Sequence, residues 1–530
     1  MADLELPTWM TPLLDAEQQR AADGWAIESG EPGIRLMERA GAGLVDELVK
    51  RVPHGRVAVV CGKGNNGGDG LVVARRLREL GRHVDVLMLA PGDELRGDAR
   101  TNFERLLREH AGTDFEPPRA AAVPFSAAPL DGAAVIVDAI LGTGFSGDPR
   151  EPARSAIEAI NAAGARGAVV VACDVPSGVD ASTGEVSGPA VRAELTATFH
   201  AAKPGLWIAP GKDHAGDVTV VPIGIGADAP VVPRLGLIDA AVLDEVPRRG
   251  RESTKFAAGA VLVCGGSLGL TGAPCLASES AQRAGAGYVT ALIPASLNLV
   301  FEQRLLEAMS VPLPDDGGAL RPEALDQIMT RCERAGALVL GPGIGRAQPT
   351  QELVQAVAGG APIPLLLDAD GLFAYSGRLS ELADRAAATV MTPHAGELGR
   401  LLERDSSEIE AHRLSAVREA SSAAQAIVVL KGDDTIVCAP DGRAAISRGG
   451  AAALATAGTG DVLSGVIGAY LSKRMDPFTA ACAGVFVHAR AGQLAAVEIG
   501  DEGVIASDVI GLLPRARAAV EGDGDPRGER

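Results

Sequence analysis

The chain has 530 residues, 47% hydrophobic and 22% charged, which is typical of a globular protein with more than one core and excludes disorder for most of its length. A formal net charge of −19 argues against a broad nucleic-acid-binding surface. The seven cysteines form no CxxC pair, and the first fifteen residues lack the basic and apolar regions of a secretory signal. No charge-free apolar run reaches the roughly 18 residues of a membrane span, and we expect a reducing, cytoplasmic compartment.

The first half of the chain alternates apolar strands with amphipathic helices. Continuous apolar strands separated by helices are typical of a parallel sheet covered on both faces, with ligands at the carboxyl ends of the strands. In chain order the pattern predicts helices at 16–29 and 33–50, a strand at 56–61, a helix at 70–80, and strands at 83–89, 133–140, 168–173 and 218–223.

A second series of the same kind begins near residue 256. Its predicted strands lie at 259–264, 288–293, 337–340, 364–368, 388–391 and 426–430, and a long helix covers 462–472. Prolines and a basic run separate the two series, and the halves share no sequence repeat. We therefore expect two different three-layer α/β/α domains, at 1–227 and 255–520, with a linker at 228–254 and a charged tail at 521–530.

A glycine-rich segment follows the first strand of the first half. It reads Gly62-Lys63-Gly64-Asn65-Asn66-Gly67-Gly68-Asp69-Gly70 and opens a predicted helix. Backbone amides left bare by glycine at a helix N-terminus suit a pyrophosphate group. The segment matches neither the dinucleotide-binding GxGxxG pattern nor a phosphate-binding P-loop. An isolated glycine pair would indicate only a tight turn, but five glycines and two asparagines in nine residues favour a binding loop.

Two aspartates end later strands of the same half. Asp138 precedes the loop Leu141–Asp148, and Asp174 opens the segment Asp174-Val175-Pro176-Ser177-Gly178. The carboxyl ends of parallel strands converge on one crevice, so one aspartate can serve as an acid or base and the other as a cation ligand. Oxygen groups of Asn66, Asp138 and Ser177 suit a hard cation, and a single carboxylate among them favours a monovalent one. The alternative is that each aspartate only caps a helix or turn.

These motifs, with Arg35–Gly41 and Ala202-Lys203-Pro204-Gly205-Leu206, resemble the NAD(P)H-hydrate epimerase family over residues 10–226. The resemblance implies a Rossmann-like fold that interconverts the R and S epimers of hydrated NADH or NADPH. It implies that Asp174 contacts the reacting ring and leaves open whether Asp174 moves a proton; Lys203 receives no role. By the same resemblance potassium is bound by Asn66, Asp138 and Ser177, and the substrate by Asn65, Asn66, Gly67, Gly68, Asp69, Gly142, Thr143, Gly144, Phe145, Ser146, Gly147, Asp148 and Asp174.

The second half carries its own glycine segments. Gly265–Ala273 and Gly341–Gly345 each follow a strand, and Ala457-Gly458-Thr459-Gly460-Asp461 precedes a long helix. A glycine loop at a helix N-terminus can stabilise a phosphoryl group during its transfer, and an aspartate there can accept the proton of an attacking hydroxyl. Lys431, after a strand, suits a phosphate partner, whereas helix capping by Asp461 is the plain alternative. Pro393-His394 with Glu397 three residues later favours the same crevice.

From Lys255 to Asp508 this half resembles the NAD(P)H-hydrate dehydratase family, which has a ribokinase-like fold. In that family a nucleotide phosphorylates the added hydroxyl, and phosphate then leaves as the double bond reforms; bacterial members use ADP. The resemblance implies Asp461 as the base, the hydrated cofactor on Ala273, Gly343, His394 and Asp461, and Mg²⁺ with ADP on Lys431, Gly432, Asp433, Asp434, Thr435 and Gly460. The run Thr254-Lys255-Phe256 departs from the His-Lys-Gly common in that family.

The order of the two resemblances is that of bifunctional NAD(P)H-hydrate repair enzymes, in which an epimerase supplies a dehydratase specific for the S form. One rival interpretation is a small-molecule kinase with an accessory ligand-binding domain, since ribokinase-like folds also phosphorylate vitamins and sugars. Another is a non-catalytic binding domain, which the paired aspartates and the acidic net charge disfavour. We expect hydrated NADH or NADPH and ADP or ATP as ligands, and neither nucleic acid nor a membrane. The sequence leaves open a homo-oligomer, the choice between ADP and ATP, and the preference for either hydrate.

Overall fold

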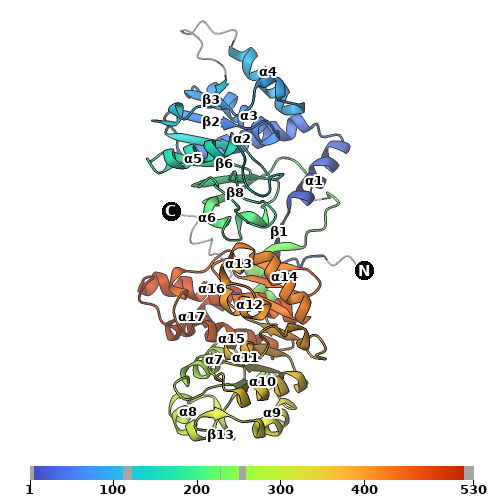
Figure 1. Ribbon diagram of the computed structural model, residues 1–530, viewed down its shortest axis with the longest axis vertical. Helices are drawn as coiled ribbons and strands as arrows, with labels where there is room; N and C mark the ends of the chain where they lie inside the picture. Colours follow the sequence, from blue (N-terminus) through green and yellow to red (C-terminus); the bar gives the residue numbers. More distant parts are fainter. Residues whose placement is uncertain (1–4, 111–121, 227, 250–257, 519–530) are drawn as a thin grey trace. The chain divides into compact units, whose positions relative to one another are not determined.

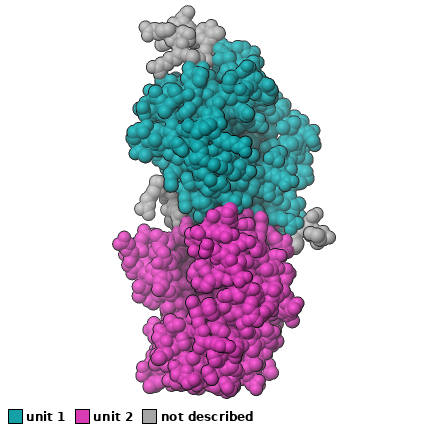
Figure 2. Space-filling model, viewed as in Figure 1, with its two compact units in different colours: residues 1–5, 12–235 teal, residues 6–11, 236–530 magenta. Residues whose placement is uncertain are grey.

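A computed structural model describes residues 5–110, 122–226, 228–249 and 258–518 of the chain, which divides into two compact units (Figures 1 and 2). Unit 1 comprises Met1–Glu5 and Pro12–Leu235, and unit 2 comprises Leu6–Thr11 and Gly236–Arg530. The expected linker at 228–254 is therefore partly structured, because β9 (Leu235–Ile238) and the 3-10 helix η4 (Ala240–Glu245) contribute to unit 2. The run around Lys255 and the predicted tail lie outside the described residues.

Unit 1 is a three-layer α/β/α domain, as the sequence predicts. The aliphatic side chains of α2 and α3 pack on one face of its sheet, and those of α5 pack on the other. The strands are β2 (Val57–Cys61), β3 (Val84–Met88), β4 (Val123–Pro124), β5 (Val135–Ala139), β6 (Val169–Cys173), β7 (Leu195–Phe199) and β8 (Asp217–Val221). The helices are α1 (Ala16–Glu28), α2 (Gly33–Arg51), α3 (Asn65–Glu79), α4 (Gly97–His110), α5 (Ala153–Gly164) and α6 (Lys212–Ala215).

The sheet of unit 1 has the order β4-β3-β2-β5-β6-β7-β8, and every neighbouring pair is parallel. Chain order reverses between β2 and β5, so the loops that follow these two strands diverge and leave a crevice. The glycine segment follows β2 and the Leu141 loop follows β5, which puts both at this crevice. The sequence analysis missed β7, a buried strand whose threonines and aromatic residue interrupt the aliphatic pattern.

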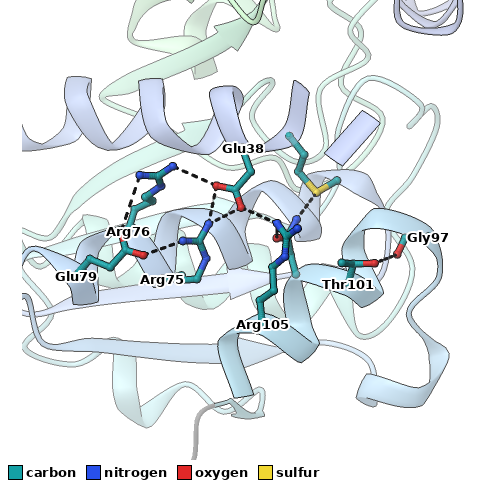
Figure 3. Close-up of polar contacts among 9 residues, drawn as sticks. Glu38, Arg75, Arg76, Glu79, Gly97, Thr101 and Arg105 are labelled. Carbon is teal, nitrogen blue, oxygen red and sulfur yellow. Dashed lines mark hydrogen bonds and ion pairs between the residues drawn. The ribbon is translucent and has the colours of Figure 1, made fainter. Parts of the chain in front are cut away.

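A polar network joins helix α3, which begins in the glycine segment, to helices α2 and α4 (Figure 3). Glu38 on α2 accepts hydrogen bonds from Arg75 and Arg76 of α3 and from Arg105 of α4, with a Glu38 Oε2 to Arg75 Nη2 distance of 2.6 Å. Arg75 is buried and is paired a second time, with Glu79. Because these charge-assisted contacts meet on one carboxylate, they join the last turns of α3 to α2 and α4.

Unit 2 is a larger α/β domain. Its strands are β1 (Met10–Leu13), β9, β10 (Ala260–Cys264), β11 (Tyr288–Pro294), β12 (Met309–Leu313), β15 (Ala337–Leu340), β16 (Leu365–Leu367), β17 (Thr389–Met391), β18 (Ile427–Leu430), β19 (Ile436–Cys438) and β20 (Ala444–Ile446), with β13 (Asp315–Asp316) and β14 (Ala319–Leu320) as a separate hairpin. Its helices are α7 (Gly272–Arg283), α8 (Asn298–Arg304), α9 (Leu325–Cys332), α10 (Gln348–Gly360), α11 (Asp370–Phe373), α12 (Ala395–Leu402), α13 (Ser406–Ala411), α14 (Arg413–Ala424), α15 (Thr459–Leu471), α16 (Pro477–Ile499) and α17 (Ala506–Ala518).

The large sheet of unit 2 has the order β1-β9-β20-β19-β18-β17-β16-β15-β10-β11-β12. Its strands are parallel from β18 through β12, whereas β19 and β20 form an antiparallel extension that the sequence analysis did not predict. Chain order reverses between β15 and β10, so the two glycine segments that follow these strands adjoin. A Cβ atom on Gly265 would lie 2.2 Å from the Pro342 carbonyl oxygen, and only glycine permits this approach.

Helix α16 bears on the expectation that the chain contains no membrane-spanning run. Helix α16 is long and apolar enough to cross a membrane by length and composition, and it is the one such helix within the described ranges. However, 56% of its apolar window is buried inside the protein, where it packs on α15, α17 and the sheet. Core helices of large α/β domains have the same composition, because a helix covered on all sides loses its polar face.

Candidate active sites

The first candidate site is a cavity of about 780 Å³ in unit 1, at the carboxyl ends of β2 and β5. Its lining includes the glycine segment, the Leu141 loop, the end of β6 and one face of α1. Phe145, Leu141, Met37 and Ile140 give the wall an apolar part, while Asp23, Asp69 and Asp174 interact with Lys203. An apolar slot with few convergent polar groups is the usual form of a cofactor-sized site.

The glycine segment is helical where the sequence analysis expected a loop. Helix α3 begins at Asn65, five residues before the predicted start, and Gly64 is its N-cap. A Cβ atom on Gly67 would lie 1.9 Å from the Gly62 carbonyl oxygen, and one on Gly68 would lie 2.7 Å from Met37 Cε. These two glycines therefore permit close packing and do not line the cavity, whereas Asn65, Asn66 and Asp69 do.

Asp174 is held by the most completely buried lysine of unit 1. Lys203 has no exposed surface, and its Nζ atom donates to Asp174 Oδ1 at 2.7 Å, to Thr198 Oγ1 at 2.9 Å and to the Phe199 carbonyl at 2.8 Å. The same Asp174 oxygen accepts hydrogen bonds from Thr198 Oγ1 and the Phe199 amide. Asp174 adopts a φ of 66°, rare for a non-glycine residue, and lines the cavity. Lys203 thus orients Asp174 and keeps one carboxylate oxygen available to a ligand.

Two of the other carboxyl groups that line this cavity, Asp69 and Asp23, are coupled electrostatically to Asp174 and Lys203. Burial raises the pKa of Asp69 well above its usual value, and the nearby Asp174 and Asp23 charges raise it further. Burial also raises the pKa of Asp23, an effect that a hydrogen bond from Gln19 opposes. Three carboxyl groups against one buried lysine favour a site that holds a proton at neutral pH.

The three predicted cation ligands lie together beneath the Leu141 loop. Fully buried Asp138 accepts hydrogen bonds from Ser177 Oγ at 2.6 Å, from the Ser177 amide at 2.8 Å and from the Ile140 amide at 3.2 Å. Asn66 donates from Nδ2 to the Leu141 carbonyl, while its buried Oδ1 atom has no hydrogen-bond partner among the described residues. Burial raises the pKa of Asp138 to about 6. An orphaned oxygen beside a buried carboxyl group and a hydroxyl fits a hard monovalent cation.

The structure divides the loop Gly142–Asp148. Gly142, Thr143, Gly144 and Phe145 line the cavity, whereas Ser146, Gly147 and Asp148 are outside its lining. Asp148 is instead paired with Arg154 at the start of α5, at 2.5 Å. The second half of the loop therefore anchors the first half to α5.

The second candidate site is a cavity of about 1100 Å³ in unit 2, between the strand ends of β18 to β20 and helices α15 and α16. Five of the six predicted nucleotide-binding residues line it, namely Lys431, Gly432, Asp433, Thr435 and Gly460. Asp434 does not, because its buried carboxylate pairs with Arg413 of α14 at 2.9 Å. Asp434 thus anchors the loop to α14. The sequence alone could not distinguish this role from ligand contact, because the neighbouring residues of the same loop line the cavity.

Asp461 lies on the first turn of α15 beside a buried charged cluster. Lys431 Nζ is 3.0 Å from Asp368 Oδ1 and 3.6 Å from Glu397 Oε2, and Asp368 also accepts a hydrogen bond from Ser464 of α15. Although burial opposes it, Asp368 and Glu397 raise the pKa of Lys431. Burial raises the pKa of Asp461 to about 7, and the Asp368 charge adds to this rise. A carboxyl group with this pKa is suited to accept a proton near neutral pH.

The predicted contacts of the hydrated cofactor, Ala273, Gly343, His394 and Asp461, are outside the lining of the second cavity, and the first three follow β10, β15 and β17. A Cβ atom on Gly343 would lie 3.3 Å from Ala273 Cβ, so these two residues adjoin at the switch between β10 and β15. His394 caps α12, with Nδ1 accepting from the Gly396 amide and Nε2 lying 3.5 Å from Glu397 Oε1. Its side chain is 55% exposed, which leaves the imidazole accessible to a ligand.

Sequence reasoning missed several of these residues. Asp368 had a signal, since it ends a strand before an Asp-Gly pair, but no role was inferred for it. Gln19 and Asp23 on α1 and His488 on α16 had none, because each sits in an ordinary helical pattern. His488 lines the second cavity, and burial lowers its pKa to about 4, so its imidazole is neutral.

Comparison with known sequences identifies both halves. A family described as YjeF-related protein N-terminus matches residues 33–205, and the NAD(P)H-hydrate dehydratase family matches residues 261–515. The bifunctional NAD(P)H-hydrate repair enzyme of Salinibacter ruber is 37% identical over 550 residues, covering 99% of each chain. That of Moorella thermoacetica is also 37% identical, covering 91% of this chain and 92% of its own.

Among solved structures, unit 2 is similar to the ADP/ATP-dependent NAD(P)H-hydrate dehydratase of Bacillus subtilis, which was co-crystallised with ATP and Mg²⁺. The sequence identity is 27% and the TM-score 0.44, with 52% of this chain and 94% of the other covered.

Proposed function

This chain belongs to the family of bifunctional NAD(P)H-hydrate repair enzymes, and from that premise we propose how its two units divide the repair. Unit 1 interconverts the R and S epimers of hydrated NADH or NADPH. Unit 2 removes the added water from the S epimer at the expense of a nucleotide. Together they return both epimers to the reduced cofactor.

In unit 2 we assign the base to Asp461. The hydroxyl of the hydrate attacks the terminal phosphoryl group of the nucleotide and gives its proton to Asp461. Phosphate then leaves with the C–O bonding electrons, and loss of a proton from the adjacent carbon forms the double bond. The amides at the N-terminus of α15 and the Lys431 ammonium lie where they can stabilise the charge on the transferring group. The pKa of Asp461, raised to about 7, supports this assignment.

The nucleotide is assigned to the second cavity, and we propose ADP as the donor. Lys431, Gly432, Asp433, Thr435 and Gly460 supply one lysine, backbone amides and hydroxyl oxygens for its phosphates. Within the described ranges, three or more His, Cys, Asp or Glu side chains do not cluster as a metal site. We propose that Mg²⁺ is held mainly by nucleotide phosphates and water with one or two carboxylates, of which Asp368 at 3.0 Å and Glu397 at 3.6 Å lie nearest to Lys431. When bound, Mg²⁺ would neutralise charge on the phosphates.

In unit 1 we assign potassium to Asn66, Asp138 and Ser177. The orphaned Asn66 Oδ1 supports this assignment, since a buried acceptor without a donor is costly unless a cation or water meets it. The cation would fix the Leu141 loop through its contacts with Asn66 and Ser177. Asp174 then contacts the ring, held at one oxygen by Lys203.

One observation carries the division of labour. Each unit has its own lysine–carboxylate pair next to its own cavity, the fully buried Lys203 with Asp174 in unit 1 and the partly exposed Lys431 with the buried Asp368 in unit 2. Two complete polar sites in one chain fit two chemical steps better than one catalytic domain with an accessory binding domain.

Recovery of dihydronicotinamide absorbance from mixed R and S hydrates tests the proposal. The full-length protein is supplied with K⁺ and Mg²⁺ and with ADP, ATP or no nucleotide. Recovery beyond the S fraction, and only with nucleotide, is the expected result, with ADP the better donor. Recovery that stops at the S fraction would contradict the assignment of unit 1. A stable phosphate ester in place of inorganic phosphate would contradict dehydration and indicate a kinase.

A further inference from the structure

Helix α1 forms a wall of the first cavity that the matched epimerase motifs do not include. The family match begins at residue 33, whereas α1 spans Ala16–Glu28. Gln19, Arg20, Asp23 and Ile27 of this helix line the cavity together with Asp69, Asp174 and Lys203. The cavity therefore contains polar groups to which no role is assigned.

Gln19 and Asp23 form a unit within this wall. Gln19 Nε2 donates to Asp23 Oδ1 at 2.9 Å, while Gln19 itself is only 4% exposed. The Gln19 Oε1 atom is buried without a hydrogen-bond partner among the described residues. A buried acceptor of this kind, on a cavity wall, indicates that a donor is supplied by the occupant of the cavity.

Asp23 is also coupled electrostatically to the other acidic groups. The Asp174 charge raises its pKa and the Lys203 charge lowers it, and Asp23 in turn raises the pKa of Asp69. All three Lys203 donors are engaged by Asp174, Thr198 and Phe199. Asp23 forms no ion pair among the described residues, and its pKa, raised by burial, suits it to carry a proton in this cavity.

Epimerisation requires groups of this kind on two faces of the ring. Water adds to a dihydronicotinamide at the carbon next to the ring nitrogen. The nitrogen lone pair can therefore help to break the C–O bond between this carbon and the hydroxyl group. Inversion then needs one group to protonate the leaving hydroxyl and another to take a proton from water that attacks the opposite face. Asp174 by itself serves one face.

We propose that Asp23, oriented by Gln19, is the second acid–base catalytic residue of the epimerase, paired with Asp174; this inference rests on the proposed function of unit 1. Asp23 donates its proton to the hydroxyl, the C–O bond breaks, water leaves, and the ring nitrogen forms a C=N⁺ bond. A second water adds from the other face and gives its proton to Asp174. One water leaves and one enters, and exchange with solvent returns the proton from Asp174 to Asp23, so atoms, protons and electrons balance without an oxidant.

The test uses the full-length protein and the isolated R epimer without nucleotide, so that dehydration is silent. Asp23→Asn is compared with Glu28→Gln, an exposed acid on the same helix. We expect kcat for epimerisation to fall by about 10²- to 10⁴-fold in Asp23→Asn with KM changed by less than about threefold, and no change in Glu28→Gln. Dehydration of the S epimer by the same preparation, with nucleotide added, checks that the chain is intact. An unchanged kcat, or a rise in KM alone, would overturn the proposal, while absence of epimerisation in the wild type would instead overturn the proposed function of unit 1.

A second measurement does not depend on any variant folding. The wild type is run in ¹⁸O-labelled water, and the S product is analysed by mass spectrometry against an enzyme-free control. Incorporation of one solvent oxygen for each inversion is expected. Retention of the original oxygen through inversion would overturn the proposal, because the bond that Asp23 is assigned to break would have stayed intact.

Discussion

At the scale of single residues, the two sites hold their principal aspartates in different surroundings. Asp461 reaches a pKa of about 7 because it is buried beside Asp368, with Lys431 only partly compensating. Asp174 is instead engaged by Lys203, Thr198 and Phe199. These environments give the two aspartates different roles although each belongs to a glycine-rich or turn segment of the sequence.

Substituting Asp461→Asn should abolish dehydration and leave epimerisation intact. Removing a general base costs about 10²- to 10⁴-fold in rate. In the wild type, dehydration should rise as the pH increases through about 7, because Asp461 accepts a proton only when ionised. Steady-state rates with the S epimer and ADP measure both effects. Loss of epimerisation in the same variant would contradict the separation of the two sites.

The same variant should be more stable than the wild type at alkaline pH. The folded pKa of Asp461, about 7, lies above its unfolded value of 3.8, so the folded chain binds the proton more tightly than the unfolded chain. The free energy of unfolding therefore falls as the pH rises from the unfolded pKa to the folded pKa. The advantage of Asp461→Asn should therefore grow as the pH rises toward 7 and reach on the order of 2 kcal/mol above it. Thermal unfolding at several pH values measures it, and an advantage independent of pH would point to a different cause.

Replacing the buried lysine of unit 1 should affect both stability and activity. Lys203→Met leaves the Asp174 carboxylate in place without its cation, and breaking a buried pair in this way costs about 3–5 kcal/mol. Lys50→Met, which removes an exposed pair with Glu47, is the control and should leave unit 1 unchanged. Thermal unfolding and epimerase assays compare the two, and equal melting temperatures would show that Lys203 is not needed to hold Asp174.

At the scale of elements, two glycine-rich segments start helices earlier than the pattern predicts. Helix α3 begins inside the segment that the pattern predicted as a loop, and α15 begins at Thr459, three residues before its predicted start. Glycine has low helix propensity, and local preference therefore placed both starts too late. Packing against Gly62 and Met37 overrides that preference in α3, because no larger residue fits there.

Gly67→Ala tests this packing. The new methyl group would meet the Gly62 carbonyl oxygen at 1.9 Å, and because the contacting atoms are backbone they cannot rotate away, so unit 1 should lose about 1–3 kcal/mol of stability. Gly144→Ala lies on the same cavity, has open space at its Cβ position and should leave stability unchanged. Chemical denaturation measures both, and equal stabilities would mean that the start of α3 can shift.

At the scale of the whole molecule, the two units carry separate sets of polar groups. Unit 1 has an all-parallel sheet of seven strands, and unit 2 has a mixed sheet with a different strand order. The predicted potassium ligands belong to unit 1, so removing them should leave the other activity unchanged.

Asn66→Leu should therefore separate the two activities. It removes the orphaned Oδ1 atom while filling a similar volume, so epimerisation should fall and lose its dependence on K⁺ concentration. Dehydration of the S epimer should match the wild type. Titration of both activities with K⁺ at constant ionic strength measures this, and a K⁺ response of epimerisation that survives in Asn66→Leu would remove Asn66 from the cation site.

The sequence by itself determined the fold class and most of the chemistry-bearing segments. Strand and helix periods are local, and so are the glycine segments that follow strands, which is why β2, β5, β10 and β15 were predicted within two residues at each end. Motif resemblance then identified Asp174 and Asp461. Local pattern could not separate Asp434, which pairs with Arg413, from its ligand-facing neighbours.

Only the tertiary structure decided which groups meet. Lys203 and Asp174 are 29 positions apart and Lys431 and Asp368 are 63 apart, and strand order rather than sequence spacing brings each pair together. The place of Asp23 in the first cavity likewise depends on where α1 packs. Burial sets the charge state of these groups, and burial is a property of the packed chain that no single segment contains.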